Sequence, residues 1–186
     1  LQNKGIIFTM LMFFLIQVCV MLLQPLITMY VGQLMGKVDD EAVQMAGVIF
    51  SLAGISGILA APFWGNRGQR YGYVRTFCYI TLGAGVVNLF QFFTTDVYQF
   101  AIVQFIFGLF LAGAIPNINA NLAEVTDKSI RGKAFGLVTS AQMSGGFVGP
   151  LLGGALGHVL PTRLVIICAG IILIGIGVKI LIEHLG

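Results

Sequence analysis

Residues 65–75 read GNRGQRYGYVR, a short segment in which three arginines are interspersed with three glycines. No charged residue occurs from Ala42 to Trp64 before it, or from Thr76 to Thr95 after it. Each flank matches the roughly 20 apolar residues that a helix needs to cross a bilayer. The segment is therefore predicted to be a short loop between two membrane-spanning helices.

The composition of the whole chain supports this interpretation. Of its 186 residues, 58% are hydrophobic and only 9% are charged, and the mean hydropathy is +0.96. Soluble domains carry about 25% charged residues. We therefore expect an all-α integral membrane protein with the lipid bilayer as its partner, since only helices satisfy their own backbone over such apolar lengths. The net charge of +3 does not indicate nucleic-acid binding, because the basic residues lie between apolar stretches.

The charge-free windows predict one domain, 1–186, of six transmembrane helices. Their approximate spans are 6–34, 42–65, 75–95, 97–122, 133–157 and 162–182. An even number of spans puts both termini on one side, together with eight of the ten Lys and Arg residues. The excess of positive charge on that side predicts that both termini are cytoplasmic. We expect a multi-pass protein of the cell membrane, a bacterial inner membrane or a plasma membrane.

The chain begins with Leu1 and not with methionine, so we expect a fragment or a processed piece. Its three cysteines lie inside apolar runs, which favours buried small side chains over a disulfide framework or a metal site.

Three motifs resemble those of the major facilitator superfamily. In the opening segment, Gly65, Arg70 and Gly72 fit the pattern Gly-x-x-x-Asp-Arg-x-Gly-Arg-Arg, although Gln69 stands where the family has aspartate. The stretch SGGFVGPLLGG, residues 144–154, resembles a motif of the drug:proton antiporter branch. The stretch AEVTDKSIRGKAFG, residues 123–136, resembles the cytoplasmic connection between the fourth and fifth helices.

The resemblance implies half of a twelve-helix transporter, built from two inverted three-helix repeats. The departure at Gln69, and Gln104 near a position where the first half usually has arginine, favour the C-terminal half of a bacterial multidrug exporter. The other six-helix half would be a missing segment, a separate chain or a second copy of this one.

The resemblance also implies roles for two of the motifs. The opening segment would act as a gating loop, with Arg70 as a latch; a purely topological role for its charges is the alternative. The motif of the fifth span would control helix bending, although a plain kinked packing helix is nearly as good an interpretation. The gating-loop residues are Gly65, Arg67, Gly68, Arg70 and Gly72, the candidate latch carboxylates are Glu124 and Asp127, and the bending residues are Gly145, Gly149, Pro150, Gly153 and Gly154.

Polar side chains inside the spans are candidates for substrate contacts, because an unpaired amide is costly in lipid. The candidates are Gln17, Gln24, Asn117, Asn121, Gln142 and Met143. Hydrogen bonding between helices is the alternative role for each amide. Amides with methionine and phenylalanine suit large, apolar, poorly specified substrates better than a sugar or a phosphate. Proton-coupled efflux of hydrophobic or cationic drugs by alternating access is therefore the expected function, with a small hydrophobic molecule as the substrate.

No Asp or Glu lies in the middle of a span, so a carboxylate for proton coupling is expected in the other half. The proton gradient would supply the energy, and we expect no cofactor and no metal. A metabolite, sugar or lipid transporter of the same superfamily is an alternative, and a six-helix scaffold or channel is another. An intramembrane protease is disfavoured, because His158 follows Ser144 by 14 residues on one helix, about 21 Å.

Overall fold

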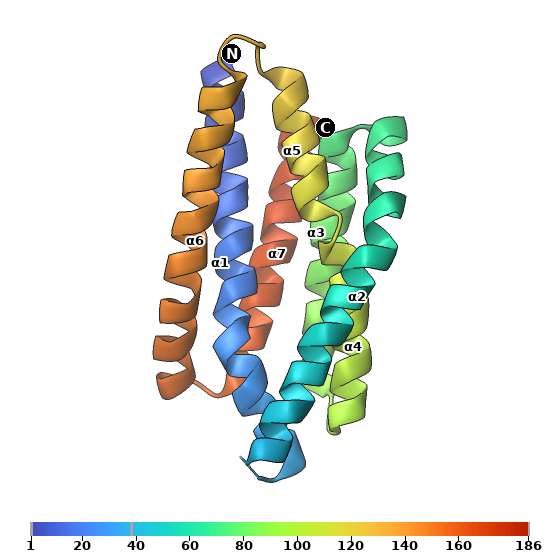
Figure 1. Ribbon diagram of the computed structural model, residues 1–186, viewed down its shortest axis with the longest axis vertical. Coiled ribbons are helices and arrows are strands. Elements are labelled where there is room, and N and C mark those ends of the chain that lie inside the picture. Colours follow the sequence, from blue (N-terminus) through green and yellow to red (C-terminus); the bar gives the residue numbers. More distant parts are fainter. Residues whose placement is uncertain (1, 38, 186) are drawn as a thin grey trace.

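The computed structural model describes residues 2–37 and 39–185, with side chains for 5–37 and 39–182 (Figure 1). Every regular element in this part of the chain is helical, which confirms the predicted all-α class. The helices are α1 (Gln2–Met35), α2 (Asp40–Tyr71), α3 (Tyr73–Phe90), α4 (Val97–Leu111), α5 (Ala114–Val125), α6 (Arg131–Val159) and α7 (Thr162–Leu185), with a 3-10 turn η1 (Gln91–Phe93) after α3.

Side-chain caps fix two of the helix starts at one end of the bundle. The carboxylate of Asp39 accepts a hydrogen bond from the backbone N–H of Ala42 (3.1 Å) at the start of α2. Asp96 does the same for the N–H of Tyr98 (2.9 Å) at the start of α4. Each cap satisfies a donor that the first turn of a helix leaves unpaired.

The helices run alternately up and down in one bundle. Both termini, the α2–α3 turn and the α5–α6 connection lie at one end, and the α1–α2, α3–α4 and α6–α7 connections lie at the opposite end (Figure 1). In the described residues, five segments are long and apolar enough to cross a membrane: α1, α2, α3 with η1, α4 with α5, and α7. The sixth helix, α6, is 29 residues long and lies along α1 (Figure 1).

The contacts between helices follow an inverted repeat. The most extensive contacts join α1 to α6, α3 to α7, and α2 to α4. If the first, second and third spans are exchanged with the fourth, fifth and sixth, α1 takes the place of α4, and α2 that of α6. The α1–α6 contact then becomes the α4–α2 contact, and the α3–α7 contact is related to itself. Because the two sets enter the membrane from opposite ends, the repeats are inverted, as predicted.

The fourth span is broken, which the sequence analysis did not predict. Residues 112–113 separate α4 from α5 within one membrane-crossing segment, Val97–Val125. The N–H of Gly113 bonds to the carbonyl of Phe110 (3.2 Å), one residue nearer than in an α-helix. Pro116 follows and has no N–H to continue the helical pattern. The carbonyl of Leu109, left without its helical partner, accepts a hydrogen bond from the indole Nε1 of Trp64 on α2 (2.6 Å).

The opening segment is a second correction, because most of it is helix and not loop. Helix α2 continues through Gly65 and Gly68 to Tyr71, and α3 begins at Tyr73. The connection between them is Gly72 alone, whose φ of +92° is readily adopted only by glycine. Gly68 serves a different need: a Cβ there would lie 2.0 Å from Oδ1 of Asn117 on α5. Gly72 therefore allows the sharp turn between α2 and α3, and Gly68 allows the close contact between α2 and α5.

Candidate functional site

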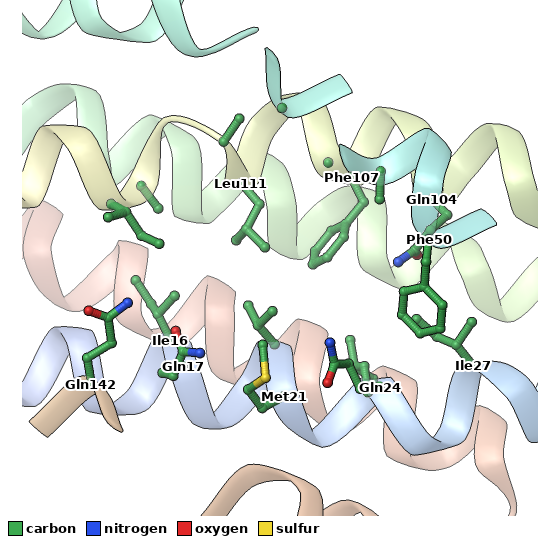
Figure 2. Close-up of a pocket in the computed structure, with 18 residues that line it drawn as sticks. Ile16, Gln17, Met21, Gln24, Ile27, Phe50, Gln104, Phe107, Leu111 and Gln142 are labelled. Carbon is green, nitrogen blue, oxygen red and sulfur yellow. The ribbon is translucent and has the colours of Figure 1, made fainter. Parts of the chain in front are cut away.

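A cavity of about 350 Å³ opens between the two repeats. Its walls are formed by α1, α2, α4, α5 and α6, and most of its lining is aliphatic or aromatic (Figure 2). Its polar side chains are four amides, Gln17, Gln24, Gln104 and Gln142. Among the described lining residues none is charged. The cavity thus offers hydrogen bonds and apolar surface, and no fixed charge.

The amides lie in two groups with an apolar stretch between them. Figure 2 shows Gln17 and Gln142 toward one end of the cavity, and Gln24 and Gln104 toward the other. Met21, Leu111 and Phe107 lie between these groups. An elongated molecule with an apolar middle and polar groups near its ends is complementary to this arrangement.

Gln104 is held in place by a buried partner. It is 5% exposed, and its Oε1 accepts a hydrogen bond from Nε2 of Gln91 (2.8 Å), which is 1% exposed in η1. This bond fixes the amide at the cavity wall, with its nitrogen drawn on the cavity side in Figure 2. In the sequence, Gln104 indicated only which half of a transporter the chain resembles. Its position as a lone amide in an apolar span was the signal that should have made it a cavity candidate.

A polar cluster continues from Gln91 toward the end of the bundle that holds the α3–α4 connection. The hydroxyl of Tyr30 on α1 lies 3.2 Å from the backbone oxygen of Thr94, which also accepts a bond from Arg163 (3.3 Å). The guanidinium of Arg163 lies 5.7 Å from the centre of the Tyr30 ring. The cluster joins α1, α7 and the α3–α4 connection beneath the cavity, so it supports the position of Gln104.

Of the six predicted cavity residues, three line the cavity, namely Gln17, Gln24 and Gln142, and three do not, namely Asn117, Asn121 and Met143. Asn117 is 1% exposed and its Nδ2 donates to the backbone oxygens of Trp64 (3.2 Å) and Gly113 (2.8 Å). Asn117 thus connects α5 to α2 by a hydrogen bond, which is the alternative role that the sequence allowed for each amide. Met143 is 66% exposed on α6 and is not among the residues that line the cavity.

The predicted bending motif divides into two groups of residues. Gly145, Gly149 and Gly153 lie against α1, where added Cβ atoms would meet α1 atoms at 2.7, 2.6 and 2.2 Å. Gly154 has no atom within 4 Å of the corresponding position. Pro150 is half-buried inside the unbroken α6. The first group sets the distance between α1 and α6; the bending role stays a prediction.

The arginines of the opening segment lie at the end of α2. Arg67 is stacked against Phe63 and Tyr71, with its guanidinium carbon 5.1 and 5.6 Å from the ring centres. Arg70 is exposed and has no ion pair with a described carboxylate. The predicted latch between Arg70 and Glu124 or Asp127 is therefore not formed in this structure, and gating by this segment stays a prediction.

A six-helix unit of two inverted repeats around a central cavity defines a half-bundle of the kind found in secondary transporters. A comparison with protein families gives the same result: residues 6–184 match the Major Facilitator Superfamily. The chain belongs to this superfamily of membrane transporters, and it is a multi-pass protein of the cell membrane.

The comparison with individual proteins finds multidrug relatives. Multidrug resistance protein MdtG of Escherichia coli (strain K12 / DH10B) is 33% identical over 136 residues, which cover 73% of this chain and 33% of that protein. Proteins of the same name from Escherichia coli O1:K1 / APEC and O139:H28 (strain E24377A / ETEC) match with the same identity and coverage. The matched region thus spans about a third of the length of these relatives.

Proposed function

We propose that this chain is half of a drug exporter that moves small hydrophobic or cationic molecules across the membrane by alternating access. The observation that carries the proposal is the uncharged cavity, in which four amides interrupt an apolar lining. Such a lining can accept molecules of varied shape through apolar burial, and the amides orient their polar groups. The names of the multidrug relatives support the same substrate class.

The proposal assigns energy coupling to the rest of the transporter. Proton coupling needs a titratable side chain within the membrane, and the described lining of this cavity has none. We propose that the other six-helix half supplies the carboxylate and completes the cavity, and that this chain is the C-terminal half. A binding site shared between the halves would open to either side as the halves rock.

The test measures efflux of a fluorescent lipophilic cation from vesicles that contain the full-length protein. Gln104→Leu removes one amide at nearly constant volume. We expect KM to rise by about 3- to 10-fold, since a net hydrogen bond contributes about 0.5–1.5 kcal/mol. Met143→Leu is the matched control, because Met143 lies on α6 outside the cavity and is exposed.

Two results would contradict the proposal. If Gln104→Leu and Met143→Leu both exported the dye with unchanged KM, the cavity would not be the binding site. If the full-length protein moved no lipophilic cation but accumulated a sugar or another metabolite, the alternative substrate class would be correct.

A further inference from the structure

A second hollow lies at the end of the bundle that carries both termini, between α2 and α3. Its volume is about 370 Å³, and it is separate from the central cavity. It is lined by two arginines, three aromatic residues and a threonine: Trp64, Arg67, Tyr71, Arg75, Thr76 and Tyr79. We call it the α2–α3 groove.

The groove presents two positive charges without a matching acid. Arg67 is stacked on Phe63 and Tyr71, which holds its planar guanidinium at the groove wall. Arg75, from the first turn of α3, is exposed. Neither forms an ion pair with a carboxylate in the described part of the chain, whereas Lys37 at the opposite end pairs with Asp39 and Glu41. Two arginines that line one hollow without an ion pair to a described carboxylate favour an anion with several oxygen atoms.

The surroundings of the groove match the boundary between headgroups and hydrocarbon. Tryptophan and tyrosine are enriched at that depth in membrane proteins, and three such rings line this hollow. On α2, an exposed apolar stripe leads from Arg67 toward the middle of the membrane: Phe63, Leu59 and Ile55 are 52%, 64% and 50% exposed. Successive members are four positions apart, so each lies beside the next along α2, from Ile55 to Arg67. The stripe gives an acyl chain an apolar surface directly below the arginines.

We propose that the α2–α3 groove binds the phosphate headgroup of an anionic phospholipid. Arg67 and Arg75 would bind the phosphate oxygens, the aromatic rings would surround the headgroup, and an acyl chain would lie along Phe63 and Leu59. A zwitterionic lipid carries an ammonium beside its phosphate, so it would bring a third positive charge close to the two arginines. The groove therefore selects a headgroup with net negative charge.

Native mass spectrometry of the full-length protein can measure this binding. The protein is purified in detergent and titrated with phosphatidylglycerol, with phosphatidylethanolamine, and with inorganic phosphate alone. We expect phosphatidylglycerol to bind more tightly than the other two. The loss of one basic residue near a membrane surface weakens binding by about fivefold. Arg75→Gln should therefore raise the Kd for phosphatidylglycerol about fivefold, and the double variant Arg67→Gln/Arg75→Gln about 30-fold.

Lys133→Gln is the matched control, because it removes one exposed positive charge from α6 at the same end of the bundle. It should leave phosphatidylglycerol binding unchanged. Arg75→Gln is the primary variant, since Arg75 is exposed and its loss should not prevent folding. Three results would overturn the proposal: unchanged binding by Arg75→Gln, equal binding of phosphatidylethanolamine, or full displacement of the lipid by millimolar inorganic phosphate.

Discussion

The contact between α1 and α6 gives the sharpest prediction for stability. At Gly153, an added Cβ would lie 2.2 Å from the backbone oxygen of Leu22 and 3.0 Å from its carbonyl carbon. These atoms belong to the α1 backbone, which cannot move aside as a side-chain tip can. Restoring ordinary contact distances of about 3.5 Å or more would push α6 away from α1 by roughly 1 Å. Gly153→Ala should therefore loosen the whole interface.

The expected magnitude combines two opposing terms. Overpacking of this kind costs about 1–3 kcal/mol, and we expect the upper part of that range because backbone atoms clash. Alanine in place of glycine inside a helix returns about 0.8–1 kcal/mol. Gly153→Ala should be less stable than the wild type by about 1–2 kcal/mol. At Gly154 no atom lies within 4 Å of the new Cβ. Gly154→Ala should therefore be more stable than the wild type by the helix-propensity term alone, about 0.8–1 kcal/mol.

The assay heats the detergent-purified full-length protein and follows the folded fraction by size-exclusion chromatography. A difference of about 2–3 kcal/mol between the two variants corresponds to a gap in Tm of about 5–10 °C. The two glycines are neighbours on one helix, so membrane depth and helix propensity are matched. If Gly153→Ala melted at the same temperature as Gly154→Ala, the close contact between α1 and α6 would be wrong.

Three further outcomes follow from other parts of the bundle. Trp64→Phe leaves the carbonyl of Leu109 without its donor, which should lower the free energy of unfolding by about 1–3 kcal/mol; an unchanged Tm would contradict this. The hydrogen bond from the N–H of Ala42 lowers the pKa of Asp39 below its ordinary value of 3.8, so the stabilisation is present above that value and is lost as pH falls below it. The hydrogen-exchange protection factor at the start of α2, which is corrected for the intrinsic pH dependence of exchange, should decrease below pH 3.8 and stay constant between pH 5 and 7. Arg70→Ala should change the rate of dye efflux if the gating proposal holds, and a normal rate would refute it.

The overall architecture could be predicted because lipid imposes it on the sequence. Charge-free windows locate the helices, since a charged side chain in the hydrocarbon is costly. The break in the fourth span does not follow from that rule. It depends on Gly113, on Pro116 and on a tryptophan far away in the chain, Trp64, whose indole satisfies the freed carbonyl of Leu109. Sequence windows show which residues are apolar, but not which distant donor meets a particular carbonyl.

The central cavity was predicted in part, for a similar reason. Gln17 and Gln24 are seven residues apart, which puts both on one face of α1, and both line the cavity. Asn117 had an equally promising position but faces α2. The rotation of α5 about its axis decides this difference, and that rotation is set by the break before α5. Gln104 carried the same signal as the other amides, but its bond to Gln91 could not be predicted, because the third predicted span treated Gln91 as part of one continuous helix.

The two symmetry-related helix contacts show why motif glycines identified only one of the interfaces. At the α1–α6 contact the small residues are on α6, where Gly149 and Gly153 meet the α1 backbone. At the related α2–α4 contact the tightest approach is made by Gly108 on α4, where a Cβ would lie 2.1 Å from Oγ of Ser56. At Gly54 on α2, no atom lies within 4 Å of the position of an added Cβ. The inverted repeat requires close approach at both places, but either helix of a pair can supply the small residue. A motif search therefore finds the contact on α6 and misses its counterpart, while the geometry of the repeat predicts both.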